Sequence, residues 1–197
     1  MNYGEELAFW YLRLNGFFPI SNFVIHKSSE VEYSSDCDLL AIRPPYVYEE
    51  IGGKQDDWDT FLNERFDLNL TIGLICEVKT GGYKLKEIFR ESNLIYSIRR
   101  LGFVPPRKIM SVAKELDSHA VLRISETYQI GKLLIANHFI DNKNSERLLF
   151  YSLDKVIEFI KNRIAKYQYE KYRDRIFFNS TLVQYFMDDI FKKKDAE

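Results

Sequence analysis

The sequence predicts an α/β protein in which helices flank a central sheet and a helical extension follows at the C-terminal end. Residues 3–15 carry apolar side chains at helical spacing, which predicts an amphipathic helix. Residues 38–42 and 72–76 form compact apolar runs bounded by turn residues, as is typical of buried strands. Residues 153–167 return to the helical period and begin the predicted extension.

The first third of the chain predicts a helix followed by a hairpin. Gly16 is the expected stop of the first helix, and residues 17–26 have the alternation of an extended strand. Residues 36–43 form the second strand, which ends before Pro44. Residues 44–70 are acidic and weakly periodic, so we interpret them as an insertion or lid with one short helix near residues 59–65.

The middle of the chain predicts a third strand over residues 71–79 and an amphipathic, basic helix over residues 84–101. Residues 108–126 favour a helix followed by irregular chain. Two more strands are expected at residues 132–137 and 147–151.

The predicted domain organisation is a core over residues 1–151, containing the 44–70 insertion, and a helical extension over residues 152–197 packed on that core. The extension should contain the helix over 153–167 and end in a helix within residues 169–194.

Composition is that of one globular domain with embellishments: 197 residues, 46% hydrophobic, with a net charge of −1. The charge is uneven, because residues 30–70 sum to −8 while residues 84–108 and 155–194 each sum to +5. A basic surface follows if the two positive segments meet in space, and ordinary solvated helix faces are the alternative.

Cysteine usage and the N-terminal sequence predict a reduced, soluble, cytoplasmic protein. Cys37 and Cys76 lie in separate apolar runs without CxxC spacing, so we expect buried thiols and neither a zinc site nor a disulfide framework. The acidic N-terminus lacks the basic region of a signal peptide, and no apolar run reaches the length of a membrane span.

The residues that carry chemistry are acids and one lysine at the ends of predicted strands. Glu77 and Lys79 alternate along one strand, so their side chains project from the same face. Asp38 opens the other apolar run, and antiparallel pairing of the two strands would place it beside Glu77 and Lys79. Two or three carboxylates with a lysine suit Mg²⁺-assisted attack of water on a phosphodiester.

Each of these residues also has a plainer structural reading. Asp36 rivals Asp38 for the aspartate position. Glu77 and Lys79 could form an exposed ion pair that contributes little stability. Glu5 could favour the dipole of the first helix, although it shares a helix face with apolar residues. The other acid-x-Lys pattern, at residues 141–143, lies in a polar turn and is set aside.

Three motifs in this order carry a family resemblance: Gly4-Glu5-x-x-Ala8 in the first helix, Asp38-Leu39-Leu40-Ala41, and Cys76-Glu77-Val78-Lys79-Thr80-Gly81. Together they resemble the PD-(D/E)XK nuclease superfamily, and in particular its restriction-endonuclease-like and Holliday-resolvase-like members. The resemblance covers roughly residues 3–101. It implies a mixed sheet flanked by helices in the order αβββαβ.

The resemblance also implies roles for individual residues. Asp38, Glu77, Glu5 and the backbone carbonyl of Val78 would bind Mg²⁺ or Mn²⁺, and Lys79 would be the catalytic lysine. The sequence departs from the family in two respects: no proline precedes Asp38, and the insertion is longer than in compact members.

The expected activity is therefore metal-dependent hydrolysis of phosphodiester bonds, with DNA as the substrate. Lys86 and Arg90, on the basic helix expected from Lys84, would contact the phosphate backbone. The alternative is a catalytically silent module of the same fold that binds protein or nucleic acid. A homodimer or protein contact would use residues 44–70 or the C-terminal helices, and no membrane contact is expected.

Overall fold

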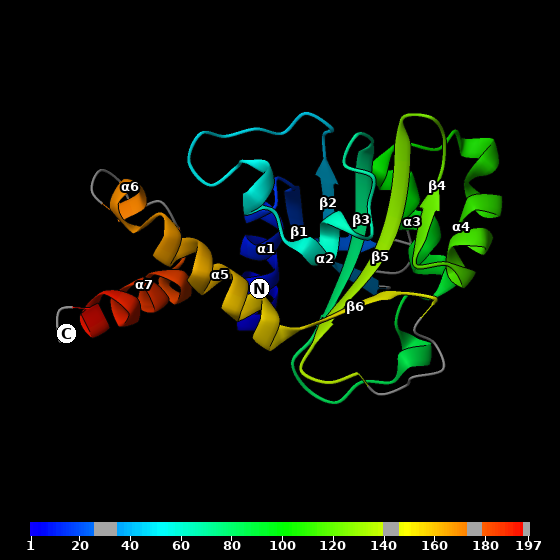
Figure 1. Ribbon diagram of the computed structural model, residues 1–197. Helices are drawn as coiled ribbons and strands as arrows, with labels where there is room; N and C mark the ends of the chain where they lie inside the picture. Colours follow the sequence, from blue (N-terminus) through cyan, green and yellow to red (C-terminus); the bar gives the residue numbers. More distant parts are fainter. Residues whose placement is uncertain (26–34, 140–145, 173–178, 195–197) are drawn as a thin grey trace.

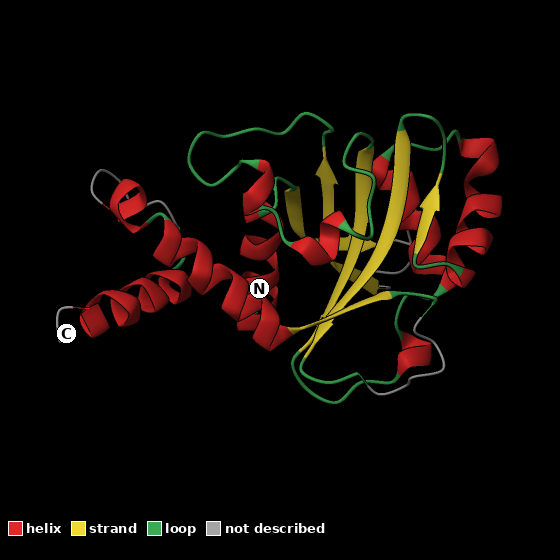
Figure 2. Cartoon of the chain, viewed as in Figure 1, coloured by secondary structure: helices red, strands yellow, loops and turns green. Residues whose placement is uncertain are grey.

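The computed structural model describes residues 1–25, 35–139, 146–172 and 179–194. It shows an α/β protein with a mixed, open six-strand sheet flanked by helices (Figure 1). One apolar cluster lies between the sheet and helices α1 and α5, and the second lies between the sheet and helices α3 and α4. The sheet is therefore covered on both faces (Figure 2).

The strands run in the order β1-β2-β3-β5-β4, and β6 also pairs with β5. Strands β1 to β3 form an antiparallel meander, β3 runs parallel to β5, and β5 runs antiparallel to β4 and parallel to β6. Their bounds are β1 Phe18–Ile25, β2 Ser35–Arg43, β3 Thr71–Lys79, β4 Val121–Arg123, β5 Tyr128–Ala136 and β6 Leu149–Ser152.

The helices connect and follow these strands. The α-helices are α1 Tyr3–Leu14, α2 Thr60–Asn63, α3 Glu91–Leu101, α4 Ile109–Ser118, α5 Leu153–Lys166, α6 Gln168–Tyr172 and α7 Thr181–Lys194. Three short 3₁₀ turns are η1 Gln55–Asp57, η2 Leu85–Glu87 and η3 Pro106–Lys108. Most predicted elements are thereby confirmed, including the hairpin, the strand over 71–79 and the helix that begins at Leu153.

The helix predicted over residues 84–101 is wrong in its first turns. Residues 85–87 form only η2, and α3 begins at Glu91. Between them, Ile88 and Phe89 turn their side chains into the core, and Phe89 has a φ of 54°. A positive φ cannot continue a right-handed helix. Lys86 therefore lies in η2 and Arg90 at the N-cap of α3, and the two do not share the single α-helix that was expected.

One edge of β5 pairs with β3 along its whole length, and the other edge pairs first with β4 and then with β6. Gln129 to Gly131 pair with β4, whereas Leu133 to Ala136 pair with β6. Lys132 lies at the change, and its backbone N–H donates to the Ala120 carbonyl at 2.8 Å. The sequence predicted irregular chain where β4 lies, because a three-residue strand carries no measurable alternation.

Residues 44–70 are anchored on the core rather than extended as an open insertion. Trp58, Leu62 and Phe66 are buried, and the Phe66 ring packs over Gly131, where an added Cβ would clash at 2.5 Å. The carboxylate of Asp59 accepts hydrogen bonds from the hydroxyls of Tyr11 and Tyr151. This segment thus contributes to the packing on the α1 and α5 side of the sheet.

The C-terminal helices continue from the same side. Helix α5 packs on α1, and α7 packs on α5 through Val183 and Met187. Figure 1 shows α6 and α7 on the side of α5 away from the sheet. Across the described ranges, every helix is too short or too polar to cross a lipid bilayer.

Candidate functional site

The candidate site forms where the ladder between β2 and β3 ends. Leu39 opposite Cys76 is the last pair of that ladder. Beyond it, the Asp38 carboxylate accepts the backbone N–H of Val78 at 2.7 Å. The side chain of Asp38 thus takes the place of a strand carbonyl, and this hydrogen bond holds its carboxylate against β3.

Glu77 and Lys79 project from the same face of β3, as their alternation predicted. The ammonium of Lys79 lies 2.9 Å from Glu77 Oε2 and 2.9 Å from Asp38 Oδ2. Asp38 is 9% exposed and Glu77 is 7% exposed, so the contact of Glu77 with Lys79 is not the exposed ion pair of the plainer reading. The structure therefore brings Asp38, Glu77 and Lys79 together.

Burial and charge shift the protonation equilibria of this cluster. Burial raises the pKa of Glu77 to about 7, the negative charge of Asp38 adds to the rise, and Lys79 opposes it. Burial alone would lower the pKa of Lys79, but its ion pairs with Glu77 and Asp38 outweigh that effect and raise the pKa. One ammonium therefore does not fully compensate two buried carboxylates.

The two cysteines border this cluster without joining its chemistry. Cys37 and Cys76 are both buried and unpaired, as expected. Burial raises the pKa of each thiol, and the nearby acids raise it further. Because the thiolate is the reactive form, both groups are unreactive at neutral pH.

Glu5, which was expected to be a metal ligand, is engaged in the cap of its own helix. Its carboxylate accepts hydrogen bonds from the backbone and side chain of Asn2, which closes the capping box of α1. The first turn of α1 nevertheless lies against the end of β3, because a Cβ on Gly4 would meet Thr80 Cγ2 at 2.4 Å. The observed role of Glu5 is thus to cap the helix beside the site.

The donor set available to a metal ion consists of two carboxylates. In the part of the chain that the structure describes, no three His, Cys, Asp or Glu side chains gather in a metal-binding group. The side chain of Asp36, the rival of Asp38, lies outside the described residues. Two carboxylates still suit Mg²⁺, which binds one or two together with water and substrate oxygens.

The backbone carbonyl of Val78 was the fourth expected ligand. In a strand, the N–H and C=O of one residue point to the same neighbour. Because the Val78 N–H reaches Asp38, its carbonyl faces the same side of β3. The residues present therefore fit a hard divalent ion held by oxygen atoms, with Lys79 as the neighbouring cation.

Sequence reasoning missed one charged residue on the same face of the sheet. Lys132 lies in the middle of β5, is 2% exposed, and is paired in register with Ile75. Its signal in the sequence is a single lysine interrupting the apolar run of β5. Charged residues are rarely buried without a partner, so a lysine at this place in an apolar strand is a candidate functional residue.

Comparison with known protein families, with curated proteins and with solved structures finds no match to this chain. Its function must therefore be inferred from the geometry of its own residues.

Proposed function

We propose that this protein is a Mg²⁺- or Mn²⁺-dependent nuclease that hydrolyses phosphodiester bonds, with DNA as its substrate. The observation that carries the proposal is the convergence of Asp38, Glu77 and Lys79 at one end of the β2–β3 pair. Two buried acids bridged by one lysine leave a site that favours a further cation, as the raised pKa of Glu77 indicates.

The proposed fold family is the restriction-endonuclease-like one. The order α1-β1-β2-β3, the antiparallel meander and the parallel return to β5 agree with the αβββαβ core of that family. Helices α3 and α4 and the short strand β4 lie between β3 and β5, so this chain adds a helix and a strand to the crossover.

In the proposed site, the carboxylates of Asp38 and Glu77 and the carbonyl of Val78 would hold the metal ion. A bound Mg²⁺ would lower the pKa of a coordinated water and neutralise charge on the phosphate. Lys79, held 2.9 Å from each carboxylate, would orient a water or donate to a phosphate oxygen. The Val78 N–H keeps Asp38 in place throughout.

The basic segment after β3 would contact the nucleic-acid backbone. Lys84 precedes η2 and Lys86 lies within it, and both side chains are exposed. Arg99 and Arg100 are exposed in the last turn of α3. Such contacts release counterions from the nucleic acid, so binding should weaken as the salt concentration rises.

A second candidate function is a binding module with this fold and no catalysis. Two observations favour it: Glu5 is engaged in its own helix cap, and Lys79 already bridges both carboxylates. If the ammonium is the permanent counterion of the pair, the site needs no metal ion. The residues available for a partner contact are then the 44–70 segment and the C-terminal helices.

A cleavage assay separates the two functions. Single-stranded, duplex and branched DNA and single-stranded RNA would be incubated with the protein in Mg²⁺, in Mn²⁺ and in excess chelator. We expect metal-dependent cleavage that Glu77→Gln and Lys79→Met abolish. Glu115→Gln and Lys114→Met, on the exposed face of α4, should retain it. Cleavage that persists in both site variants would refute the assignment.

A further inference from the structure

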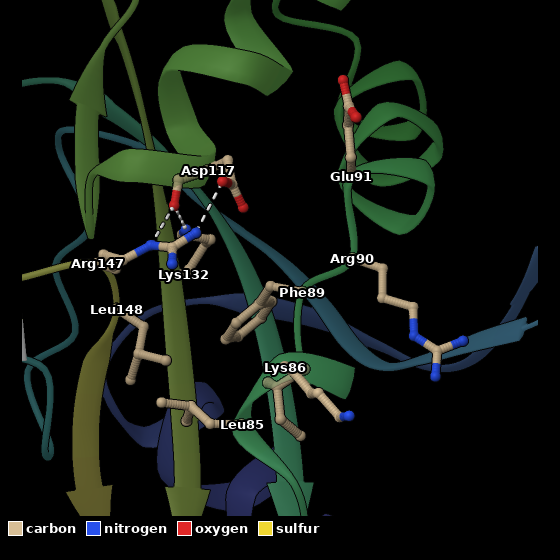
Figure 3. Close-up of a pocket in the computed structure, with 10 residues that line it drawn as sticks. Leu85, Lys86, Phe89, Arg90, Glu91, Asp117, Lys132, Arg147 and Leu148 are labelled. Atoms are coloured by element: carbon tan, nitrogen blue, oxygen red, sulfur yellow. Dashed lines mark hydrogen bonds and ion pairs between the residues drawn. The ribbon is translucent and has the colours of Figure 1, made fainter. Parts of the chain in front are cut away.

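A cavity of about 510 Å³ opens beside β5, on the face of the sheet covered by α3 and α4. Its walls come from residues 85–86 and 88–91, from the end of α4 at Asp117, and from Lys132, Arg147 and Leu148 (Figure 3). Asp38, Glu77 and Lys79 do not line it, so it is distinct from the candidate metal site. Its volume lies in the range of sites for small molecules.

Lys132 is a buried cation without a carboxylate of its own. Its ammonium donates to the Asp117 backbone carbonyl at 3.0 Å, and it forms no ion pair with any acid in the described ranges. The Asp117 carboxylate is instead occupied by Arg147, at 2.7 Å. An ammonium carries three donors, so Lys132 has donors left for a ligand.

The remaining wall is apolar and aromatic. Phe89 is 5% exposed and adopts a left-handed conformation, with φ of 54°, that an aromatic residue rarely takes. Its ring lies 5.8 Å from the Lys132 ammonium. Figure 3 shows Phe89 pointing toward Lys132, whereas Arg90 and Glu91 lie on the other side of the loop. Burial of this ring therefore fixes the loop that forms the cavity rim.

Charge in the cavity is positive on balance. Lys132 and Arg147 face a single acid, Asp117, whereas Figure 3 shows the charged ends of Lys86, Arg90 and Glu91 pointing away from that group. A ligand that matches this wall carries a compact anionic group for Lys132 and Arg147 and a flat apolar body for Phe89.

The cavity lies close to the candidate metal site. Lys132 is paired with Ile75, and Glu77 follows two residues further along β3 on the same face. Two residues along a strand and one step across it separate their Cα atoms by roughly 8 Å. A ligand held at Lys132 would thus lie beside the cluster of Asp38, Glu77 and Lys79.

We propose that this cavity binds a phosphate monoester, as carried by a nucleotide or by the end of a nucleic-acid strand, with Lys132 and Arg147 contacting the phosphate and Phe89 contacting the base. A phosphate monoester carries close to two negative charges at neutral pH, which suits an ammonium beside a guanidinium. Binding at this cavity does not require that the metal site be active.

Calorimetric titration in the presence of a chelator tests the proposal without cleavage. The probes are a thymidine dinucleotide with a 5′-phosphate, the same dinucleotide with a 5′-hydroxyl, a nucleoside monophosphate and inorganic phosphate. We expect the unchanged protein to bind the 5′-hydroxyl dinucleotide about tenfold or more weakly than the 5′-phosphate dinucleotide. We expect Lys132→Met to lower the affinity for the 5′-phosphate dinucleotide by about tenfold or more. Arg147→Gln should lower it several-fold, and the control Lys114→Met should stay within about twofold of the unchanged protein.

The probes also distinguish the source of the phosphate. Tighter binding of the phosphorylated dinucleotide than of the monophosphate identifies a strand end, and equal binding identifies a free nucleotide. If inorganic phosphate binds as tightly as the nucleoside monophosphate and the phosphorylated dinucleotide, the phosphate group alone is the ligand. Equal affinity for the 5′-phosphate and 5′-hydroxyl dinucleotides, or unchanged affinity in a folded Lys132→Met variant, overturns the proposal. Because metal is absent, these outcomes are independent of the proposed nuclease activity.

Discussion

The carboxylate of Asp38 accepts the backbone N–H of Val78 at 2.7 Å, just beyond the last pair of the β2–β3 ladder. The same oxygen, Oδ2, also accepts the ammonium of Lys79. Asp38 therefore has two functions that mutation can separate: it completes the hydrogen bonding of a sheet edge, and it supplies negative charge to the candidate site.

Substitutions of Asp38 should distinguish these functions. Asp38→Asn keeps an oxygen that can accept the Val78 N–H, whereas Asp38→Ala leaves that buried donor without a partner. We expect Asp38→Ala to be less stable than Asp38→Asn by about 1–3 kcal/mol in urea unfolding. Both variants should lose metal-dependent activity. Equal stability of the two would show that water satisfies the Val78 N–H.

The raised pKa of Glu77 predicts a pH dependence of stability. In the folded protein the pKa of Glu77 is about 7, compared with its ordinary value of 4.5. Between these two pH values the carboxyl group is therefore protonated in the folded state and ionised in the unfolded state. Stability should then fall as pH rises between these two values, by up to about 3 kcal/mol in the absence of metal.

The variant Glu77→Gln provides the control for that pH dependence, because its amide does not titrate. We expect its urea midpoint to change less between about pH 5 and about pH 8 and to exceed that of the unchanged protein at the higher pH. A steeper loss of stability in Glu77→Gln than in the unchanged protein would contradict the assigned cause.

Divalent metal should stabilise the folded protein through the same carboxylates. Mn²⁺ at about a hundred times its dissociation constant would add about 2.7 kcal/mol to the free energy of unfolding. The effect should grow as pH rises through about 7, because Glu77 must be ionised to bind the ion. Thermal unfolding with and without Mn²⁺ measures it, and Glu115→Gln is the matched control on α4. A response that survives in Asp38→Asn and Glu77→Gln would place the metal elsewhere.

Lys132→Met should stabilise the protein while removing the proposed ligand contact. Burial lowers the pKa of Lys132 to about 8, so the charged form is disfavoured in the folded state. That destabilisation is fully present below about pH 8 and disappears as pH rises toward 10.5, the ordinary pKa of lysine. At neutral pH the methionine variant should gain up to about 3 kcal/mol.

Urea unfolding in a buffer free of phosphate measures that gain, since the proposed binding of phosphate would stabilise the unchanged protein. A methionine variant that is less stable at neutral pH would show that the Lys132 ammonium serves the fold, through its hydrogen bond to Asp117, rather than a ligand.

Local periodicity in the sequence was sufficient for the elements that hold the candidate metal site. The alternation of Glu77 and Lys79 along an apolar strand places both side chains on one face whatever the rest of the chain does. The strand opened by Asp38 pairs antiparallel with it, as predicted. The first helix and its stop at Gly16 were equally local features.

The tertiary structure alone decided the rest. The helical pattern from Lys84 is interrupted at Ile88 and Phe89, whose side chains are buried in the core, and the positive φ of Phe89 ends the right-handed helical path. Glu5 caps its own helix, and Lys132 faces a cavity built by residues distant in sequence. Sequence period specifies which side of an element a side chain takes, but burial, partners and charge depend on what packs against that side.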